Sequence, residues 1–323
     1  MLVRLVKDWE SKPTFDRQTS LLTDKWKNIE ITFEEVDECD LLIVFNRPKK
    51  EIKTKVPKGN KWLVAMEPPT VSHKFYIDCY KYFDKVFTQF PLKGKNIIPS
   101  HGALPWHIGK NFDQLENLQL NLIDKKNRLS CIASNLNWMK GHELRLDLID
   151  FLKKDSFAMD LYGKGINFVP DKWDALYPYM YSIAIENTSK DHYWTEKITD
   201  CFLSWTMPVY WGAKNIFDYF PKESIIWIDP NNKKKSKRII EKAIEDNLWN
   251  KNLDAIIKAR KKVMYEYQLF PFIKHHYISN LNSSVKLEVT IPPLIAPWED
   301  GFEQTLWRKF EYNFRRLLNF KPF

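Results

Sequence analysis

YSIAIENTSKDHYWTEKITDCFLSWTMPVYWG, residues 181–212, is the stretch that decides how this chain folds. Its first five residues form a short apolar run, and the polar pair Glu186 and Asn187 follows at once. A short apolar run with a polar end is typical of a buried strand in a parallel sheet. The stretch therefore opens with a predicted strand over 181–185, and a polar loop continues from it.

A helix and a second strand are predicted in the rest of the stretch. Thr195 is a suitable N-cap for a helix that begins at Glu196. Apolar residues recur there at the spacing of one helical face: Ile198, Cys201, Phe202 and Trp205. Pro208 closes this helix, and 209–211 reads as a second strand that stops at Gly212. The order strand, loop, helix, strand predicts a parallel α/β sheet.

Candidate binding residues gather where such a sheet binds its ligands. In open α/β sheets, ligands lie beyond the carboxyl ends of the strands and against helix N-termini. Five residues fall in this zone: Glu186, Asn187, Tyr193, Glu196 and Lys197. A lysine in the first helical turn opposes the helix macrodipole, and a bound anion would reverse that cost. A surface pairing of Lys197 with Glu186 or Glu196 is the alternative.

The same stretch closely resembles the donor-binding signature of family 10 glycosyltransferases, the α-1,3/1,4-fucosyltransferases. The family pattern begins with Phe or Ile before Glu-Asn-Ser/Thr, continues with Tyr-x-Thr-Glu-Lys and ends with Pro-Val/Ile-x-x-Gly. The chain has IENT, YWTEK and PVYWG in that order. The Tyr-Trp-Gly ending is nearer to the bacterial members than to the animal ones.

The resemblance implies roles for these residues. Asn187 and Tyr193 would shape the phosphate and sugar pocket, and Glu196 would accept hydrogen bonds from ribose or fucose hydroxyls. Lys197 would meet the diphosphate. Glu186 is a further candidate of the donor site.

A second region of resemblance lies at 62–76, WLVAMEPPTVSHKFY. A predicted strand ends at Glu67, and two prolines force an extended exit. The piece is similar to the family's Glu-Ser-Pro segment of the acceptor domain, which implies that Glu67 is the catalytic base. His73 echoes a histidine that follows in many members. A plain surface glutamate is the alternative reading of Glu67.

The donor half opens with a predicted strand at 129–133, followed by Ser134 and Asn135. A helix with an apolar stripe comes next, and Arg145 lies off that stripe near its start. The family has Ser-Asn after this strand and an arginine at the head of the next helix, so the resemblance implies that Arg145 binds phosphate with its planar fork. Lys140 and His142 are nearby candidates.

Composition and charge limit the class of protein. Hydrophobic residues make up 44% of the 323 residues, enough for two ordinary cores, and only 9 glycines are present. Neither a dinucleotide fingerprint nor a P-loop occurs. The net charge of +9 suits an acidic partner such as a nucleotide diphosphate, a nucleic acid or an anionic membrane face. The four cysteines stand far apart, which favours reduced, buried thiols over a zinc site or disulfides.

The remaining chain predicts two βαβ sheets in series. Further strands are expected at 2–6, 29–33, 41–45, 62–66, 86–87, 157–162 and 225–228, and helices at 74–83, 172–178, 239–267 and 302–318. The segments 46–60 and 281–300 are expected to be loops, and 231–238 is expected to be a solvated loop and the start of a helix. The predicted domains are an acceptor-side domain over 1–120, a sugar-nucleotide domain over 121–275 and a C-terminal extension over 276–323. The helix of this extension is expected to pack back on the first domain.

The predicted fold is GT-B, two Rossmann-like domains that face a cleft. The implied reaction is inverting transfer of L-fucose from GDP-fucose to a hydroxyl of a glycan, either an oligosaccharide, a lipopolysaccharide or a glycoprotein. No DxD motif is present, so Arg145 and Lys197 would stabilise the leaving diphosphate without a metal or other cofactor. Alternatives are another nucleotide sugar, or a basic anion-binding protein without catalysis; spread-out basic residues disfavour nucleic acid. No signal peptide or transmembrane run is visible, which predicts a cytoplasmic protein and leaves a peripheral membrane contact open.

Overall fold

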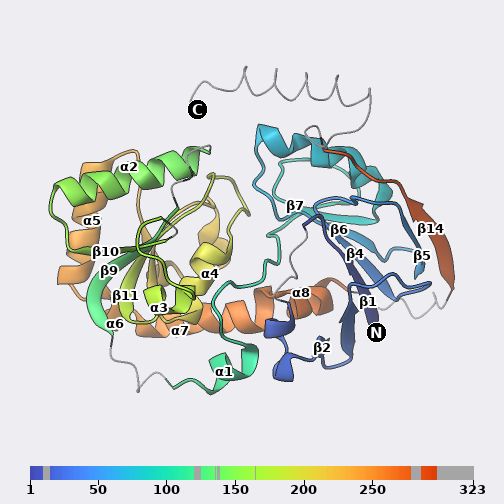
Figure 1. Ribbon diagram of the computed structural model, residues 1–323, viewed down its shortest axis with the longest axis horizontal. Coiled ribbons are helices and arrows are strands. Elements are labelled where there is room, and N and C mark those ends of the chain that lie inside the picture. The colour runs from blue at the N-terminus through green and yellow to red at the C-terminus, as the bar shows by residue number, and fades with distance from the viewer. Residues whose placement is uncertain are drawn as a thin grey trace. The chain divides into compact units, whose positions relative to one another are not determined.

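The computed structural model describes residues 1–9, 15–119, 125–134, 136, 139–163, 165–277 and 285–296. The chain divides into two compact units, and each is described by itself (Figure 1). The first unit comprises Met1–Lys12, Asp24–Gly102 and Ile278–Phe323, and the second comprises Pro13–Thr23 and Ala103–Tyr277. Both units carry a parallel sheet, as the sequence predicts.

The described residues of the first unit form a seven-stranded sheet in the order β2-β3-β1-β4-β6-β7-β8. The strands are β1 (Leu2–Val6), β2 (Lys25–Trp26), β3 (Ile29–Thr32), β4 (Leu41–Phe45), β6 (Lys61–Val64), β7 (Lys85–Thr88) and β8 (Ile97–Pro99). All neighbours pair in parallel except β2 with β3. β4 is buried along its whole length, which explains its uninterrupted apolar sequence.

Two loop predictions for the first unit were wrong. The segment 46–60 is not only a loop, because β5 (Ile52–Pro57) lies within it and pairs antiparallel with β14 (Lys286–Ile291). β14 in turn lies within the segment 281–300 that was expected to be irregular. β5 alternates buried and exposed residues, and its charged outward side chains mask the strand pattern in the sequence. The helix expected at 74–83 is a 3₁₀ helix, η3 (Val71–Tyr82). The helix predicted at 302–318 lies outside the described residues.

The second unit holds a five-stranded parallel sheet among its described residues, in the order β10-β9-β11-β12-β13. Its strands are β9 (Lys126–Ile132), β10 (Met159–Tyr162), β11 (Tyr179–Ile185), β12 (Met207–Trp211) and β13 (Ile226–Trp227). Its helices are α1 (Phe112–Asn117), α2 (Lys140–Lys154), α3 (Lys172–Leu176), α4 (Glu196–Leu203), α5 (Lys233–Glu245), α6 (Leu248–Lys251), α7 (Leu253–Lys262) and α8 (Leu269–His276). Short turns of 3₁₀ helix are η1 (Asp16–Gln18), η2 (Ser20–Leu22), η5 (Ile216–Asp218) and η6 (Lys222–Ser224), and a π-helical turn, η7 (Val263–Tyr267), joins α7 to α8.

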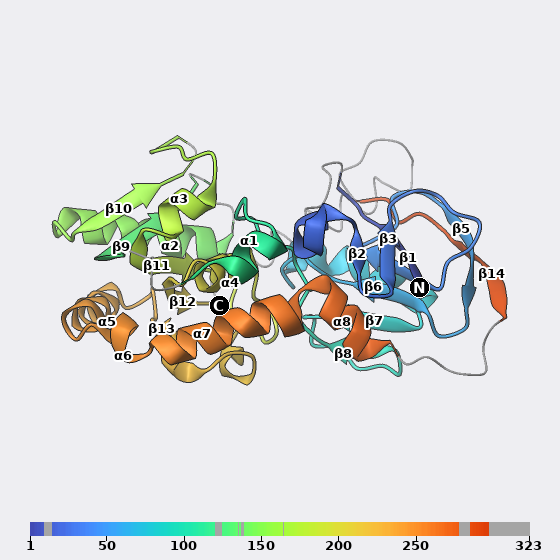
Figure 2. The ribbon, with the colours of Figure 1, turned by 90° about the horizontal axis from the view of Figure 1, so that it is seen from below.

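The helical region after residue 232 is more broken than the single helical pattern of the sequence (Figure 2). It starts at Lys233, so the basic run 231–238 is a short turn followed by the start of α5, as predicted. Asn247 takes a left-handed conformation with φ of 49° and separates α5 from α6. Asparagine tolerates this conformation better than most residues, which explains why the helix can break there.

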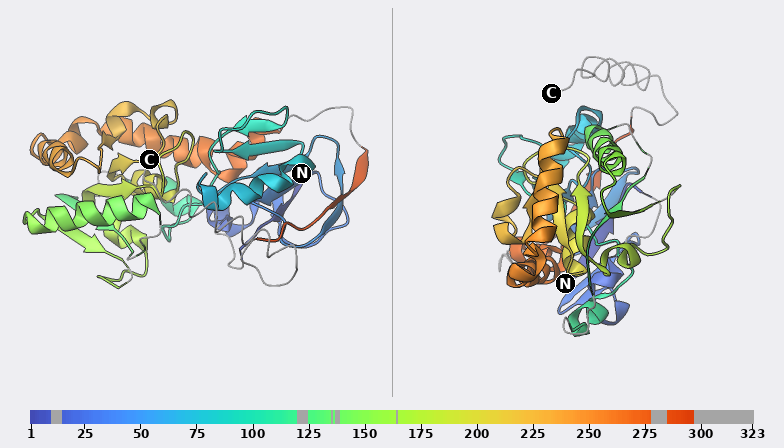
Figure 3. Two further views of the ribbon diagram at one scale, coloured as in Figure 1. Left: turned by 90° about the horizontal axis from the view of Figure 1, so that it is seen from above. Right: turned by 90° about the vertical axis from the view of Figure 1, so that its left-hand side faces the viewer.

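The core of the second unit is built on the sheet and on α2 and α5. Leu148, Ile149 and Leu152 of α2 pack with the alternate buried residues of β9, β11 and β12, and Ile240 and Ala243 of α5 join the same cluster. Figure 3 shows α2 beside the strands of this sheet. These contacts explain the apolar stripe that the sequence shows at 144–152.

The chain order places a topological switch point between β9 and β11. The chain leaves β9 for β10 on one side and later returns to β11 on the other side. Ligands of open α/β sheets bind at such a point, outside the carboxyl ends of the strands. Ala133 and Glu186 are the residues that follow these two strands.

The boundary between the units differs from the predicted position near residue 120. Residues 103–119 belong to the second unit, where Trp106, Ile108 and Leu115 are buried. Arg260 of α7 also donates a hydrogen bond to the Leu115 carbonyl. The segment has few strand signals, which placed the predicted boundary here, but its buried apolar side chains belong to the second unit.

The cysteine prediction is confirmed, because all four cysteines are buried and free. None of the helices in the described ranges has the length and apolar character that would let it cross a membrane.

Candidate donor site

A cavity of about 310 Å³ lies at the switch point of the second unit. It is lined by residues in and just after β9 and β11, by the glycine after β10 and by residues of α2, α3 and α4: Ile132, Ala133, Ser134, His142, Arg145, Gly163, Lys172, Leu176, Ser182, Ile183, Ile185, Asn187, Glu196, Lys197, Asp200 and Cys201. The predicted donor residues Arg145, Asn187, Glu196 and Lys197 are therefore brought together around one cavity.

The first turn of α4 is fixed by a buried carboxylate. Glu186 is fully buried, and its two oxygens accept hydrogen bonds of 2.8 Å from the backbone N–H and the hydroxyl of Thr195. Thr195 is the N-cap of α4, and its hydroxyl accepts from the Lys197 N–H at 3.4 Å. Lys197 Nζ lies 3.3 Å from Glu186 Oε2. Glu186 therefore supports the helix end and does not itself line the cavity.

Lys197 pairs with acids, as the alternative reading of the sequence proposed, but it is not a surface residue. Its side chain is only 22% exposed and lies 3.7 Å from Glu196 as well as close to Glu186. Burial raises the pKa of Glu186, although the charge of Lys197 opposes this shift. The lysine lines the cavity and is mostly withdrawn from water, where its charge acts strongly on a bound anion.

Two glycines allow the backbone to approach this carboxylate. A Cβ at Gly212 would meet Glu186 Cγ and the Tyr210 hydroxyl, and a Cβ at Gly141 would meet the Glu186 carbonyl. The Gly141 N–H donates a 3.0 Å hydrogen bond to the Asn187 carbonyl. The beginning of α2 is thereby joined to the segment after β11, and the close approach of Glu186 explains the glycine at the end of the 181–212 stretch.

Arg145 is the second cation of the cavity. Its side chain is buried, and its Nη1 donates a long 3.4 Å hydrogen bond to the Ile185 carbonyl. Its Nε has no hydrogen-bond partner, and the same is true of Asn187 Oδ1. Burial lowers the pKa of Arg145, but a guanidinium stays protonated at neutral pH. Buried polar atoms normally have partners, so these orphaned atoms indicate a site that a polar ligand would complete.

His142 lies beside these two residues. It is buried, and burial together with the charges of Arg145 and Lys197 lowers its pKa to about 4. At neutral pH it is therefore an uncharged imidazole, and it lines the cavity without adding a positive charge.

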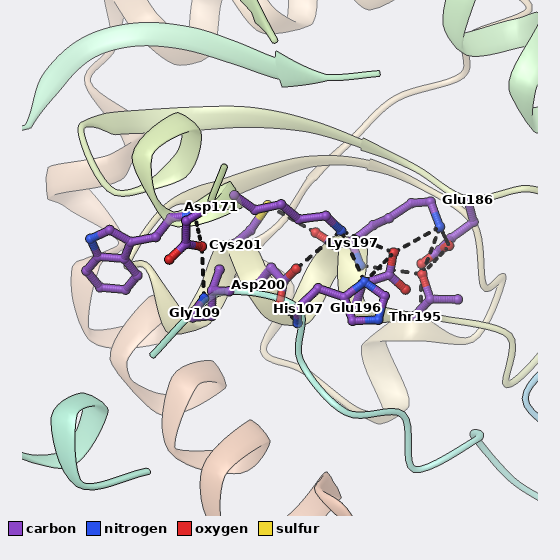
Figure 4. Close-up of polar contacts among 12 residues, drawn as sticks. His107, Gly109, Asp171, Glu186, Thr195, Glu196, Lys197, Asp200 and Cys201 are labelled. Carbon is purple, nitrogen blue, oxygen red and sulfur yellow. Dashed lines mark hydrogen bonds and ion pairs between the residues drawn. The ribbon is translucent and has the colours of Figure 1, made fainter. Parts of the chain in front are cut away.

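Three further residues, which the sequence did not single out, contact the acids of α4: Lys172 and Asp200 line the cavity, and His107 lies beside Asp200 and Glu196 (Figure 4). Lys172 Nζ lies 3.4 Å from Glu196 Oε1 and 3.5 Å from Asp200 Oδ2. The backbone N–H of His107 donates a 2.8 Å hydrogen bond to Asp200 Oδ1, and the ring Nδ1 of His107 lies 3.8 Å from Glu196 Oε1. The only sequence signal was that Asp200 lies one helical turn after Glu196.

The other predicted donor residues have different surroundings. Tyr193 is buried and is not among the residues that line the cavity. Lys140 is exposed and forms an ion pair of 3.7 Å with Glu143. Ser134 lines the cavity, and Asn135 lies outside the described residues.

The predicted base lies in the first unit, just after β6. The Glu67 side chain is 45% exposed, and its Oε2 lies 3.6 Å from His73 Nε2. His73 is buried, which lowers its pKa to about 4, so the imidazole is neutral at physiological pH. The Glu67 backbone N–H donates to Asn46 Oδ1 at 3.2 Å.

Asn46 is the centre of a polar cluster at the switch point of the first sheet, between β1 and β4. Its Oδ1 also accepts from the Met66 N–H at 2.8 Å, and its Nδ2 donates to Asp8 Oδ1 at 2.9 Å. Asp8 Oδ2 accepts from the Tyr76 hydroxyl at 3.2 Å and lies 3.7 Å from Arg47 Nε. Asn46 therefore holds the backbone of the loop that carries Glu67.

Clusters of metal-ligating side chains are absent from the part of the chain that the structure describes. No group of three or more His, Cys, Asp or Glu side chains there could hold a metal ion.

Comparison with known proteins finds a family match within the second unit. Residues 123–243 match the family model described as glycosyltransferase family 10 (fucosyltransferase) C-term. The match includes the whole 181–212 stretch and Arg145, and it leaves out Glu67 and His107. The resemblance seen in the sequence is thus confirmed for the second unit.

Curated relatives match over shorter segments. The chain is 28% identical over 102 residues to a fucosyltransferase-like protein of Arabidopsis thaliana, 31% of this chain and 20% of that protein. It is 40% identical over 52 residues to an Arabidopsis thaliana α-(1,4)-fucosyltransferase, 16% of this chain and 13% of that protein. It is 36% identical over 58 residues to the α-(1,3)-fucosyltransferase FucT of Helicobacter pylori, 18% of this chain and 12% of that protein. The matched part of the chain therefore spans a fifth or less of these relatives.

The fold is shared with a solved structure. A crystal structure of an α1,3-fucosyltransferase aligns with 79% of this chain and 80% of its own, with a TM-score of 0.50 and 17% sequence identity. At that identity the likeness concerns the fold alone, and it confirms the predicted GT-B class of two α/β units.

Proposed function

From the family 10 glycosyltransferase domain that residues 123–243 carry, we propose that this protein is a fucosyltransferase that uses a nucleotide-sugar donor. The observation that carries the proposal is the cavity at the switch point of the second unit. Arg145 and Lys197 both line it, beside the orphaned polar atoms of Arg145 and Asn187. Two cations and unpaired donors and acceptors in a partly buried pocket suit a diphosphate with hydroxyl groups attached.

The donor we propose is GDP-fucose. Its diphosphate would contact Arg145 and Lys197, whose charges stabilise the developing charge of the leaving group. Glu196 would accept hydrogen bonds from hydroxyls of the ribose or of the sugar. Because the two cations are already in place, we propose that transfer needs no metal ion. Tyr193 is buried, so its proposed part is to support the loop before α4.

The acceptor is a hydroxyl of a glycan, and transfer inverts the configuration at the sugar carbon. Glu67 would remove the hydroxyl proton as the sugar passes through an oxocarbenium-like state and the diphosphate leaves. Two observations support this role. The Glu67 carboxylate is half-exposed, so it is accessible to a hydroxyl group. The neighbouring His73 is neutral, so it does not compensate the charge of the carboxylate. Asn46 would keep its loop in place. We propose a cytoplasmic location for this reaction.

A thermal-stability screen tests the nucleotide. The protein is heated with GDP, UDP, CMP or dTDP, and a ligand that binds only the folded state raises the midpoint by mass action. We expect GDP to stabilise the protein and the others not to, and GDP-fucose with a glycan acceptor to give a fucosylated product. Stabilisation by UDP or dTDP alone would favour a transferase of another sugar. Binding of none, with tight binding to nucleic acid, would favour the non-catalytic alternative.

A further inference from the structure

Glu196 and Asp200 form a pair of carboxylates on one face of α4. They are four residues apart, which is one helical turn. Asp200 is fully buried, and the Glu196 side chain is only 14% exposed. Two like charges at this spacing and depth repel each other, so the helix needs a cation to keep both ionised.

Lys172 supplies this cation. Its Nζ lies 3.4 Å from Glu196 Oε1 and 3.5 Å from Asp200 Oδ2, so a single ammonium bridges the two acids. Lys197 and His107 also approach Glu196 Oε1, at 3.7 and 3.8 Å. Although burial opposes ionisation of Glu196, these charges hold its pKa well below the usual value. Burial instead raises the pKa of Asp200, against the charge of Lys172.

The position of Lys172 is also fixed by the hydrogen bonds of the preceding residue, Asp171. Lys172 is the first residue of α3, whose N-cap Asp171 accepts a 2.9 Å hydrogen bond from the Trp173 N–H. The same Asp171 oxygen accepts from the Gly109 N–H at 2.8 Å. A Cβ at Gly109 would meet Asp171, so the close approach requires the glycine. Figure 4 shows this chain of contacts from Gly109 to Lys197.

We infer that Lys172 is a positioning residue of the donor site, which holds Glu196 ionised at the cavity wall so that it accepts hydrogen bonds from donor hydroxyls. This inference rests on the proposed function, because it takes the occupant of the cavity to be a nucleotide sugar. A protonated Glu196 would lose acceptor capacity and would bind the donor less well.

The pH dependence of donor binding tests the inference. Affinity for GDP-fucose is measured by calorimetry, without acceptor, at pH values from 5.5 to 8.5 for wild type and Lys172→Met. Without the ammonium the two carboxylates share a proton, and the pKa of the pair rises. Since one pKa unit is a tenfold change in ionisation, we expect binding about tenfold weaker than wild type at pH 5.5 and within about threefold at pH 8.5. The ratio to wild type cancels any titration of the ligand.

Three further variants separate charge from structure. Lys172→Arg keeps the charge and should bind within about threefold of wild type at every pH. Lys172→Met combined with Asp200→Asn removes the like charge as well, and should fold and lose most of the pH dependence. Lys251→Met, an exposed lysine of α6, is the control and should match wild type.

The outcomes are distinct. A loss in Lys172→Met that is equal at every pH, or no loss, overturns the inference. If Lys172→Met does not fold, the other two variants decide. The inference is overturned if Lys172→Arg binds GDP-fucose about tenfold more weakly at every pH. It is also overturned if the affinity of the double variant, relative to wild type, still changes about tenfold between pH 5.5 and 8.5. Failure of the wild type to bind GDP or GDP-fucose, with its fold intact by circular dichroism, would refute the proposed function and not the charge balance of α4.

Discussion

At the scale of single residues, Lys197 shows how one charge can serve structure and ligand together. It neutralises the buried Glu186 and also lines the cavity. Because its charge would meet the diphosphate in the ground state and in the transition state, Lys197→Ala should weaken GDP binding and lower kcat. We expect the affinity for GDP to fall about 10- to 100-fold, which is the effect of losing one hydrogen bond to a charged group. Calorimetry with GDP and steady-state kinetics measure the two effects.

Lys190→Ala is the matched control for that experiment. Lys190 is exposed in the loop before α4, and its replacement should leave the affinity for GDP and kcat unchanged. If Lys197→Ala lowers kcat but binds GDP normally, the lysine acts only in the transition state and our account of it is wrong.

Glu67 allows a prediction with the opposite pattern. Glu67→Gln keeps the size of the side chain but cannot take a proton, and loss of a general base typically costs about 10²–10⁴-fold in rate. We expect kcat to fall by this factor, while GDP titrations overlay those of wild type. Near-normal turnover would assign the base elsewhere, with His73 the next residue to change. Loss of GDP binding would place Glu67 in the donor pocket.

At the scale of elements, the sequence predicted the second unit better than the first. β11 and α4 were foreseen because their apolar residues follow strand and helix periods without interruption. β5 and β14 were missed because they pair with each other across a long sequence separation, and such a partner leaves no local trace. Lys172, Asp200 and His107 were missed for the same reason, since each comes from a different element and only the packing of α3 on α4 joins them.

The loop of Glu67 gives a prediction at this scale. Asn46→Ala removes the acceptor of two backbone N–H groups and the donor to buried Asp8. Each buried group left unpaired costs about 1–3 kcal/mol. We expect a lower midpoint of thermal unfolding, and a kcat that falls while GDP affinity stays constant because the donor residues lie in the other unit. Asn96→Ala, which removes an amide elsewhere in the first unit, is the control: it should lower stability but not kcat.

At the scale of the whole molecule, buried histidines make stability depend on pH. The pKa of His73 is about 4 in the folded chain and about 6.5 in an unfolded one. Between these values the unfolded state binds more protons, so acidification from pH 6.5 to 4 favours unfolding. His73→Gln lacks this effect. Its stability relative to wild type, measured by urea unfolding, should therefore rise as the pH falls through that window, and a constant difference would contradict the assignment.

The interleaved division of the chain has a consequence for fragments. Residues 13–23 and 103–119 belong to the second unit, where Arg17 Nη1 donates to the Ile108 carbonyl at 3.2 Å. Ser20 donates to Asp113 at 2.7 Å, so the two segments also contact each other. We expect a fragment of residues 121–277 to unfold at lower temperature than one of residues 103–277, as followed by circular dichroism. Equal stability would show that 103–119 adds nothing to the core.

The buried ion pair of Glu186 with Lys197 has a consequence for which residues related sequences carry at these two positions. Loss of Lys197 leaves Glu186 as a fully buried carboxylate without its cation, whereas Lys197 without Glu186 keeps Glu196 as a partner at 3.7 Å. The two positions should therefore change together among related chains, and a scan of all single substitutions should find that harm at one site is partly relieved by change at the other. A glutamate that does not line the cavity would then vary only where its lysine partner varies.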